Sequence, residues 1–235
     1  MSAGFVLTAI GLVVFGYLMG SLSPSVFLGK ALKGIDVREH GSGNAGTTNA
    51  FRVLGVRLGV AVLVADIVKG VIPVVLARYL STPVVTVLVA FACVLGHDFS
   101  IFLRGRGGKG VATGAGAAIG MIPIPMAFLV ALFVIVLLAT RIVSIASITC
   151  TIALPVMAGL LYRFTSGVWG PPLPYVMACC LMSAVVLWAH RSNMRRLIHG
   201  NERRVVFPWN KKAKRKAASA VAPASQSAAA DGEAV

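Results

Sequence analysis

The sequence predicts an all-α fold: a polytopic integral membrane helical bundle of about seven transmembrane spans, with the N-terminus outside and the C-terminus cytoplasmic. Three observations predict it. The 235 residues are 57% hydrophobic and 12% charged, about half the charge of a soluble domain. Apolar runs of roughly membrane-crossing length recur along the chain. The cations gather in alternate connections between these runs.

Seven apolar runs set the predicted number of spans. They cover approximately residues 4–22, 56–77, 83–97, 111–121, 124–140, 144–162 and 174–190. A perpendicular helix needs about 20 residues to cross the bilayer, and five of the runs are close to that length. The third and fourth runs are short, so five spans are the alternative if this pair forms a re-entrant hairpin. The fourth run is rich in Gly and Ala, which lets its backbone approach neighbouring helices closely.

The distribution of cations sets the predicted orientation. With the N-terminus outside, the cytoplasmic segments hold all but three of the 22 Lys and Arg residues. Arg78 and Arg163 would face outward, and Lys69 lies within the second run. Membrane orientation and anionic head groups therefore explain the net charge of +15, and no nucleic-acid partner is expected.

Two domains are predicted, a membrane domain over residues 1–205 and a cytoplasmic tail over residues 206–235. From Lys211 the tail is basic and then rich in Ala and Ser, without apolar periodicity. Such a composition predicts disorder, with the basic half resting on anionic lipid.

The cysteines predict neither a metal site nor a disulfide framework. All four lie inside apolar runs without CxxC spacing, so we expect small buried hydrophobic side chains. They are Cys93, Cys150, Cys179 and Cys180.

The first polar motif is GSGNAGTTNAFR, residues Gly41–Arg52. Its glycines can adopt positive φ and expose successive N–H groups, which is a geometry that holds anions. Arg52 can bind a phosphate through two parallel hydrogen bonds. A capped loop before a helix is the simpler interpretation, but the small polar groups outnumber what capping needs. We therefore predict phosphate contacts from Ser42, Asn44, Thr48, Asn49 and Arg52.

The second polar motif is GHDFSIFLRGRGGKGVAT, residues Gly96–Thr113. A glycine loop leads into a helix start, where free N–H groups and the helix dipole favour an anion. The loop is not a Walker A sequence, because Leu103 occupies the place of its first Gly. An ordinary basic loop would need the cations but not the glycines. The motif predicts a phosphate site made by Gly107, Gly108, Lys109 and Gly110.

The third polar motif is HRSNMRRLIHGNE, residues His190–Glu202. His190 and Asn193 are three residues apart at the end of the last run, so on a helix they would share one face. A lone His at a helix end commonly serves only as a cap, and the neighbouring Asn is the reason to keep a catalytic role as the alternative. Glu202 is interpreted as structural, pairing with loop cations.

Two further polar groups lie within the apolar runs. Asp66 and Lys69 are three residues apart, and each charge near mid-membrane costs about 3 kcal/mol. They are expected to pair, as a structural feature, or to face an internal polar cleft. Ser144 and Ser147 lie near the predicted inner surface, where they join helices or line the same cleft. Ser147 is therefore kept as a candidate phosphate-binding residue.

Together these motifs resemble those of the bacterial acyl-phosphate:glycerol-3-phosphate acyltransferases. The family pattern reads roughly GSGNxGxTNxxR, GHxFxxFxxxxGGKGVAT and HRxNxxRLxxGxE, and the chain carries all three in order over about residues 10–205. The family's DxxKG step occurs at Asp66–Gly70. Asp98 and Ser100 depart from the pattern, because small residues or Pro are commoner there. The HxxxxD pair of many other glycerolipid acyltransferases is missing.

The resemblance implies a multi-pass enzyme of the bacterial inner membrane with its active site on the cytoplasmic side. The implied reaction moves a fatty acyl group from acyl phosphate to the 1-hydroxyl of glycerol 3-phosphate, giving 1-acylglycerol 3-phosphate (lysophosphatidic acid) for phospholipid biosynthesis. By position, Ser42, Lys109, His190 and Asn193 would be catalytic, and Glu202 would be needed for integrity. We expect a monomer in membrane lipid, with no cofactor and no metal.

Acyl phosphate is already activated, so this chemistry needs aligned anions and a stabilised oxyanion but no covalent enzyme nucleophile. The proton acceptor stays open between His190 and a substrate phosphate. The competing class is a membrane transporter of an organic phosphate, because Gly-rich spans with anion-binding ends also mark transporter sites. Against it, the three motifs lie on one predicted side and no inverted repeat is visible.

Overall fold

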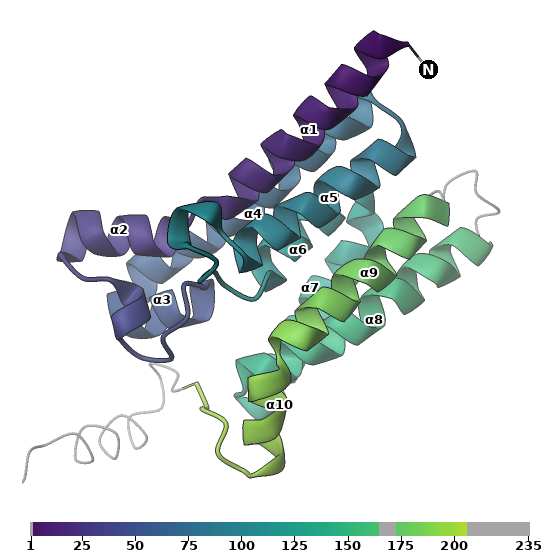
Figure 1. Ribbon diagram of the computed structural model, residues 1–235. Helices are drawn as coiled ribbons and strands as arrows, with labels where there is room; N and C mark the ends of the chain where they lie inside the picture. Colours follow the sequence, from purple (N-terminus) through teal and green to yellow (C-terminus); the bar gives the residue numbers. More distant parts are fainter. Residues whose placement is uncertain (1, 165–172, 206–235) are drawn as a thin grey trace, which may run out of the picture. The chain divides into compact units, whose positions relative to one another are not determined.

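The computed structural model describes residues 2–164 and 173–205, and all regular structure within these residues is helical (Figure 1). Five segments are long and apolar enough to cross a membrane. They are α1 (Ala3–Ser21), α4 (Val56–Leu80), α7 (Pro123–Thr140), α8 (Val143–Phe164) and the segment Pro83–Leu103, which combines α5 (Pro83–Asp98) with the 3-10 helix η2 (Ile101–Leu103).

Two further apolar helices complete the bundle. α9 (Leu173–Ala189) is followed after a 57° bend by α10 (Arg191–Ile198), and this pair counts as a sixth span if it is taken together. α6 (Val111–Met121) has 11 residues, a length of about 16 Å, which is short of the hydrocarbon thickness. Each of the seven predicted apolar runs is therefore confirmed as helical, whereas the count of seven spans stays a prediction.

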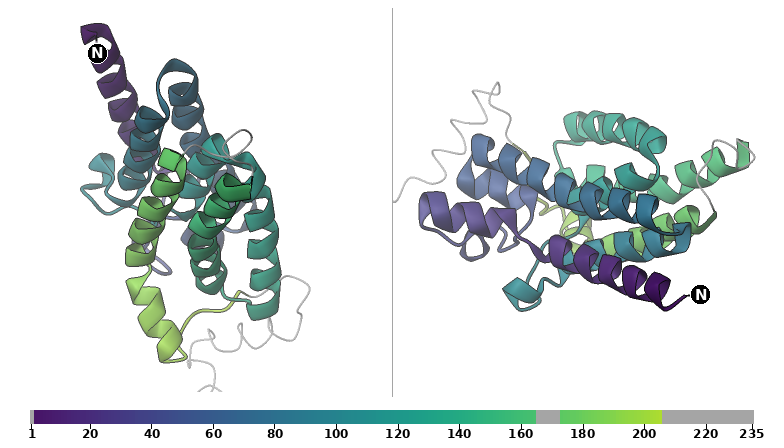
Figure 2. Two further views of the ribbon diagram at one scale, coloured as in Figure 1. Left: turned by 90° about the vertical axis from the view of Figure 1, so that its right-hand side faces the viewer. Right: turned by 90° about the horizontal axis from the view of Figure 1, so that it is seen from above.

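Three short helices lie in the connection between α1 and α4. They are α2 (Pro24–Lys33), the 3-10 helix η1 (Val37–Glu39) and α3 (Thr47–Leu54). α2 ends at Gly34, whose positive φ of 66° closes the helix in a left-handed cap. In the views of Figures 1 and 2, α2, α3 and α10 lie toward the end of the bundle opposite the start of α1.

The long helices present apolar side chains outward and polar side chains inward, as expected for a protein solvated by lipid. Leu7 on α1, Phe128 on α7 and Ile135 on α7 are more than half exposed. By contrast, Asp66 and Lys69 on α4 are almost completely buried. The outer surface therefore suits a hydrocarbon environment, and the polar groups are kept for the interior.

Small residues let the central helices approach closely. A Cβ added to Gly70 on α4 would collide with the carbonyl oxygen of Thr113 on α6, and one added to Gly116 on α6 would collide with that of Ile67. Backbone contact of this kind is how helices associate in lipid, where burial of apolar surface gives little driving force. The Gly/Ala-rich composition of α6 therefore positions the loop that precedes it against α4.

Two details differ from or lie beyond the sequence-based expectations. Cys93 and Cys179 are buried, as predicted, and Cys150 is only partly buried. Cys180 is exposed, because it lies next to Cys179 on α9 and neighbouring residues of a helix point in different directions. The tail predicted to be disordered, residues 206–235, lies outside the described residues.

Candidate active site

The three polar motifs meet at one end of the bundle, as the sequence predicts. A Cβ added to Gly46 would lie 3.9 Å from the Cα atom of Gly108, so the first and second motifs are in contact. The Nζ atom of Lys109 donates a hydrogen bond to Oδ1 of Asn193, which joins the second motif to the third. Their convergence is confirmed, and it places small polar groups beside permanent cations.

The first motif forms a turn that Asn49 holds in shape. Gly41 and Gly43 have positive φ values of 64° and 72°, which places Ser42 at an exposed position between them. The N–H of Ser42 donates to Oδ1 of Asn49 over 2.8 Å, and Nδ2 of Asn49 donates to the carbonyl of Val37 over 2.7 Å. Asn49 is 1% exposed. Its predicted phosphate contact is therefore not available in this arrangement, because its amide already supports the turn.

The rest of the first motif opens toward the other two. Oδ1 of Asn44 accepts a hydrogen bond from the N–H of Gly46 over 2.9 Å, immediately before α3 begins. Arg52 lies on the last turn of α3 and is close enough to Lys109 to influence it electrostatically. The hydroxyl groups of Ser42 and Thr48 make no hydrogen bond within the described residues, so both are available to a ligand.

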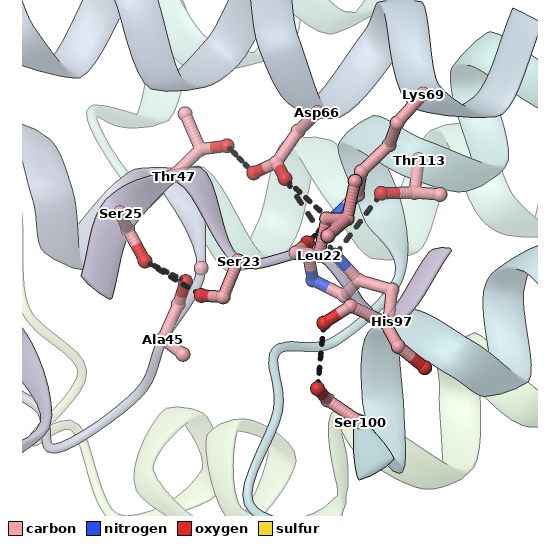
Figure 3. A network of polar contacts seen from close by, with 12 residues as sticks. Leu22, Ser23, Ser25, Ala45, Thr47, Asp66, Lys69, His97, Ser100 and Thr113 are labelled. Atoms are coloured by element: carbon pink, nitrogen blue, oxygen red, sulfur yellow. Dashed lines mark hydrogen bonds and ion pairs between the residues drawn. The ribbon is translucent and has the colours of Figure 1, made fainter. Parts of the chain in front are cut away.

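A buried polar network joins the first and second motifs to α4 (Figure 3). Asp66 on α4 forms an ion pair of 2.9 Å with Lys69 and accepts a hydrogen bond of 2.8 Å from the hydroxyl of Thr47. Nδ1 of His97 lies 3.7 Å from the Asp66 carboxylate and 3.0 Å from the hydroxyl of Thr113. The predicted pairing of Asp66 and Lys69 is confirmed. The network also ties α3, α5 and α6 to α4.

The glycine loop of the second motif lies directly on the end of α5. The N–H groups of Gly107 and Gly108 donate to the carbonyls of Asp98 and His97, over 3.1 and 2.9 Å. The predicted phosphate contacts of these two N–H groups are therefore not available, because both are already bonded. A Cβ on Gly108 would collide with the His97 ring, so glycine is needed here for close approach.

At the start of α6, the predicted phosphate contacts of Lys109 and Gly110 stay a prediction, because within the described residues no such main-chain bonds occupy them. Gly110 has a positive φ of 67° and precedes the first turn, which leaves unpaired N–H groups as every helix start does. Lys109 lies immediately before it with its side chain half-buried. A helix start beside a lysine remains a suitable environment for a phosphate.

A chain of hydrogen bonds runs from Lys109 through Asn193 to Glu202. Oδ1 of Asn193 accepts from Lys109, while its Nδ2 donates to Oε1 of Glu202 over 2.6 Å. Glu202 also accepts from Nε of Arg196 over 2.7 Å and from the hydroxyl of Ser144 over 3.0 Å. The interpretation of Glu202 as a structural partner of a cation is in agreement with this geometry, and the carboxylate fixes which way Asn193 points.

His190 lies at the break between α9 and α10 rather than within one continuous helix. It caps the start of α10 without a side-chain capping bond, and its carbonyl accepts from the N–H of Met194 over 2.9 Å, so the first turn of α10 carries both His190 and Asn193, and both side chains are buried. Its Nδ1 is 2.8 Å from the carbonyl oxygen of Val186. Because a carbonyl can only accept, Nδ1 carries the proton, and the neutral ring presents Nε2 as a proton acceptor. His190 is 3% exposed and close enough to Lys109 and Glu202 to interact with both charges.

The charges in this cluster are adjusted by burial and by each other. Burial, and to a smaller extent the nearby cations Arg196 and Arg52, lower the pKa of Lys109 from 10.5 to about 8, and Glu202 opposes the shift. For Glu202, burial acts to raise the pKa, but the hydrogen bonds from Asn193 and Arg196 outweigh it and the pKa is lowered. Glu202 is therefore ionised, whereas Lys109 can change charge near neutral pH.

A polar cavity of about 300 Å³ opens beside Lys109, between the end of α5 and the junction of α9 with α10. This volume is at the lower end of the range for small-molecule sites. Cationic side chains from the second and third motifs line the cavity, together with small polar groups from the first and third motifs. Its lining includes Asn44, Asp98, Arg106, Gly107, Gly108, Lys109, Trp188, Arg191 and Ser192.

Sequence reasoning located most of these groups and missed some. Ser147 is buried on α8, and within the described residues its hydroxyl makes no hydrogen bond, to Lys109 or to any other group. His97 and Arg196 were not predicted as site residues, although both fall within the polar motifs. The signal available for Arg196 was its spacing, six residues before the only carboxylate of the third motif.

Comparison with known proteins identifies the family. Residues 10–200 match the family model of glycerol-3-phosphate acyltransferases. The glycerol-3-phosphate acyltransferase of Rubrobacter xylanophilus is 43% identical over 194 residues, covering 82% of this chain and 93% of that protein. The chain belongs to the glycerol-3-phosphate acyltransferase family. The relative of the same name from Geotalea daltonii is 41% identical over 192 residues, covering 81% and 94%.

Solved structures resemble this acyltransferase over most of its length. The glycerol 3-phosphate form of PlsY, an integral membrane glycerol 3-phosphate acyltransferase, gives a TM-score of 0.77 at 36% identity and covers 85% of this chain and 96% of that one. The lysophosphatidic acid form gives a TM-score of 0.75 at the same identity. This acyltransferase is thus a multi-pass helical membrane protein.

Proposed function

We propose that this acyltransferase uses acyl phosphate as its donor and transfers the acyl group to the 1-hydroxyl of glycerol 3-phosphate. The observation that carries the proposal is the hydrogen-bonded chain from Lys109 through Asn193 to Glu202 beside His190, at the edge of a polar cavity. Both substrates are phosphate esters or anhydrides, and Lys109 and Arg52 supply cations from two different motifs. The family's activity toward glycerol 3-phosphate supports the choice of acceptor.

The chemical step is a direct acyl transfer. The 1-hydroxyl oxygen of glycerol 3-phosphate attacks the carbonyl carbon of acyl phosphate, the bond from that carbon to the bridging phosphate oxygen breaks, and inorganic phosphate leaves. In this proposal Lys109 aligns the phosphates and stabilises the developing negative charge, and Asn193, whose amide bonds both Lys109 and Glu202, holds the ammonium group in position. The hydroxyl proton passes to a substrate phosphate, with His190 orienting the substrates; proton transfer to Nε2 of His190 is the alternative route.

The proposed orientation in the membrane is inferred from the distribution of Lys and Arg among the connections between helices. With seven spans and the N-terminus outside, α6 crosses the bilayer and the three motifs face the cytoplasm. The enzyme then acts as a monomer in the bacterial inner membrane. The fatty chain of the donor stays in lipid, where each buried methylene contributes about 0.8 kcal/mol, while its phosphate lies at the inner surface.

The donor is tested by supplying the purified protein with glycerol 3-phosphate and either acyl phosphate or the corresponding acyl-CoA. We expect 1-acylglycerol 3-phosphate from acyl phosphate alone. Rapid quenching during turnover should recover no acyl group on the protein, because the donor is already activated. An acyl ester trapped on Ser42 would contradict direct transfer, and product from acyl-CoA at an equal rate would contradict the donor.

A further inference from the structure

Asp98 is a buried carboxylate for which the described protein provides no partner. It is the last residue of α5 and is 7% exposed. Its main-chain carbonyl accepts from the N–H of Gly107, but neither side-chain oxygen has a hydrogen-bond partner within the described residues.

A buried carboxyl group without hydrogen bonds is costly and needs an explanation. The other carboxylates of the described chain that are not exposed are all engaged. Asp36 pairs with Arg38 at 2.7 Å, Asp66 pairs with Lys69, and Glu202 accepts three hydrogen bonds. Asp98 is therefore an exception among the described residues, and its unpaired oxygens point to a hydrogen-bond donor outside them.

The position of Asp98 indicates what that group is. Its side chain lines the cavity beside Lys109, together with Asn44 and Ser192. Lys109 is close enough to interact with it electrostatically. In either protonation state a carboxyl group offers a hydrogen-bond acceptor oxygen, and the cations of the cavity are the better partners for a phosphate, so a ligand here needs a donor group separate from a phosphate on the cationic side. A hydroxyl group on a short phosphorylated polyol has this chemistry.

We propose that Asp98 accepts a hydrogen bond from the 2-hydroxyl of glycerol 3-phosphate. The inference rests on the proposed function, in which the phosphate is held near Lys109 and the 1-hydroxyl must point at the donor carbonyl. The 2-hydroxyl is the remaining donor on the acceptor and lies between those two groups in the molecule. A hydrogen bond to the 2-hydroxyl restricts rotation about the carbon chain and directs the 1-hydroxyl toward the donor. Asp98 therefore helps to determine which acceptor is used.

The test compares two acceptors with three enzymes. The acceptors are glycerol 3-phosphate and 3-hydroxypropyl phosphate, which keeps the reacting hydroxyl and the phosphate but lacks the 2-hydroxyl. The enzymes are the unaltered protein, Asp98→Asn and Asp98→Ala. The measured quantity is the ratio of KM values for the two acceptors, or of inhibition constants if the analogue is not turned over. Because both acceptors carry the same phosphate, a general change in the charge of the cavity cancels in the ratio.

We expect the unaltered protein to favour glycerol 3-phosphate and Asp98→Ala to lose about 10- to 100-fold of that preference, the range expected when a buried donor is left without its partner. Asp98→Asn should lose less, because its amide oxygen still accepts. The thermal midpoint should stay the same or rise in both variants, because no hydrogen bond within the protein is removed. Asp36→Asn is the matched control: it breaks a paired carboxylate and should lower the midpoint without changing the ratio.

Two results would overturn the inference. An unchanged acceptor ratio in Asp98→Ala would show that the carboxylate does not contact the 2-hydroxyl. An equal loss of kcat for both acceptors in Asp98→Asn would show that the carboxyl group acts on a step common to both and not on the 2-hydroxyl. Failure of the proposed function is distinguishable, because the unaltered protein would then not acylate glycerol 3-phosphate from acyl phosphate.

Discussion

Lys109 shows how the position of one residue sets its chemistry. In an exposed loop it would be an ordinary lysine, charged at every physiological pH. Here it is half-buried between the glycine loop and α10, and its pKa is lowered to about 8 by burial and neighbouring cations. Binding a dianionic phosphate favours the charged form, so the affinity for substrate and the protonation of Lys109 are linked.

This linkage predicts a pH dependence of kcat/KM for glycerol 3-phosphate. The lysine is charged below its pKa and neutral above it, so kcat/KM should fall as the pH rises through about 8. The measurement is a series of kcat/KM values from about pH 7 to about pH 9.5, where the phosphate stays dianionic because its second pKa is about 6. In Lys109→Arg the fall near pH 8 should disappear, because Arg stays charged. A fall that persists unchanged in Lys109→Arg would assign it to another group.

Substitutions at Lys109 and His190 should affect different kinetic constants. Lys109→Ala removes a cation from the phosphate and leaves the amide oxygen of Asn193 without its donor, so KM should rise about 10- to 100-fold. His190→Ala removes a group that orients or deprotonates the acceptor, so kcat should fall about 100-fold or more. Steady-state kinetics with both substrates varied would separate the two effects. Unchanged constants in both variants would remove the site from this end of the bundle.

At the residue scale, the sequence predicted an ion pair correctly, but it did not predict which hydrogen-bonding groups are already engaged within the protein. The Asp66–Lys69 pair follows from helical spacing and the high free energy of isolated charges in a membrane. The roles of Asn49 and of the Gly107 N–H could not be predicted, because they depend on which carbonyls from α5 and η1 lie nearby. Those carbonyls are distant in sequence, and only the packing of the elements brings them into reach.

At the scale of elements, the glycine loop and α6 behave as one unit held between α4 and α5. Hydrogen bonds from Gly107 and Gly108 fix the loop to the end of α5. Backbone contacts at Gly70 and Gly116 fix α6 to α4. Because both ends are held by main-chain contacts, the position of Lys109 depends on residues that have no functional group of their own.

Gly108→Ala should therefore impair both stability and activity. The added methyl group would collide with the ring of His97, and overpacking of this kind costs about 1–3 kcal/mol. We expect a lower thermal midpoint in detergent and an activity reduced about 10-fold or more, because displacement of the loop also moves Lys109. Gly11→Ala on α1 is the control, since no atom lies within 4 Å of the added Cβ. Equal behaviour of the two variants would contradict the close packing of the loop.

The apolar runs predicted the long helices but not the short ones. α2, α3 and α10 contain eight to ten residues and mix polar with apolar side chains, so a search for apolar runs passes over them. The break at His190 was missed for a related reason. His, Arg, Ser and Asn are compatible with a helix, and the bend depends on how α10 packs against Ser144 and Lys109 through Glu202 and Asn193.

At the scale of the whole molecule, one end of the bundle is polar and cationic and the remainder is apolar. The three motifs are separated by more than 40 residues along the chain, yet hydrogen bonds and backbone contacts join them at this end. Such an asymmetry suits an enzyme whose donor has its chain in lipid and its phosphate at the surface. We therefore predict that this polar, cationic end faces the cytoplasm.

Cysteine labelling tests this orientation. In a background with the four native cysteines replaced by Ala, Tyr79→Cys at the exposed end of α4 should react with an impermeant maleimide in right-side-out vesicles. Lys33→Cys at the end of α2 should react only in inverted vesicles, because the cationic connection lies inside. The reverse pattern would place the three motifs outside and remove their access to a cytoplasmic substrate.

The most direct measurement follows inorganic phosphate and labelled glycerol 3-phosphate together, with the purified protein in proteoliposomes containing acyl phosphate. Direct acyl transfer predicts one inorganic phosphate released for each 1-acylglycerol 3-phosphate formed, and no phosphate release when glycerol 3-phosphate is absent. Accumulation of unmodified glycerol 3-phosphate inside the vesicles, without acylated product, would contradict it and favour a transporter.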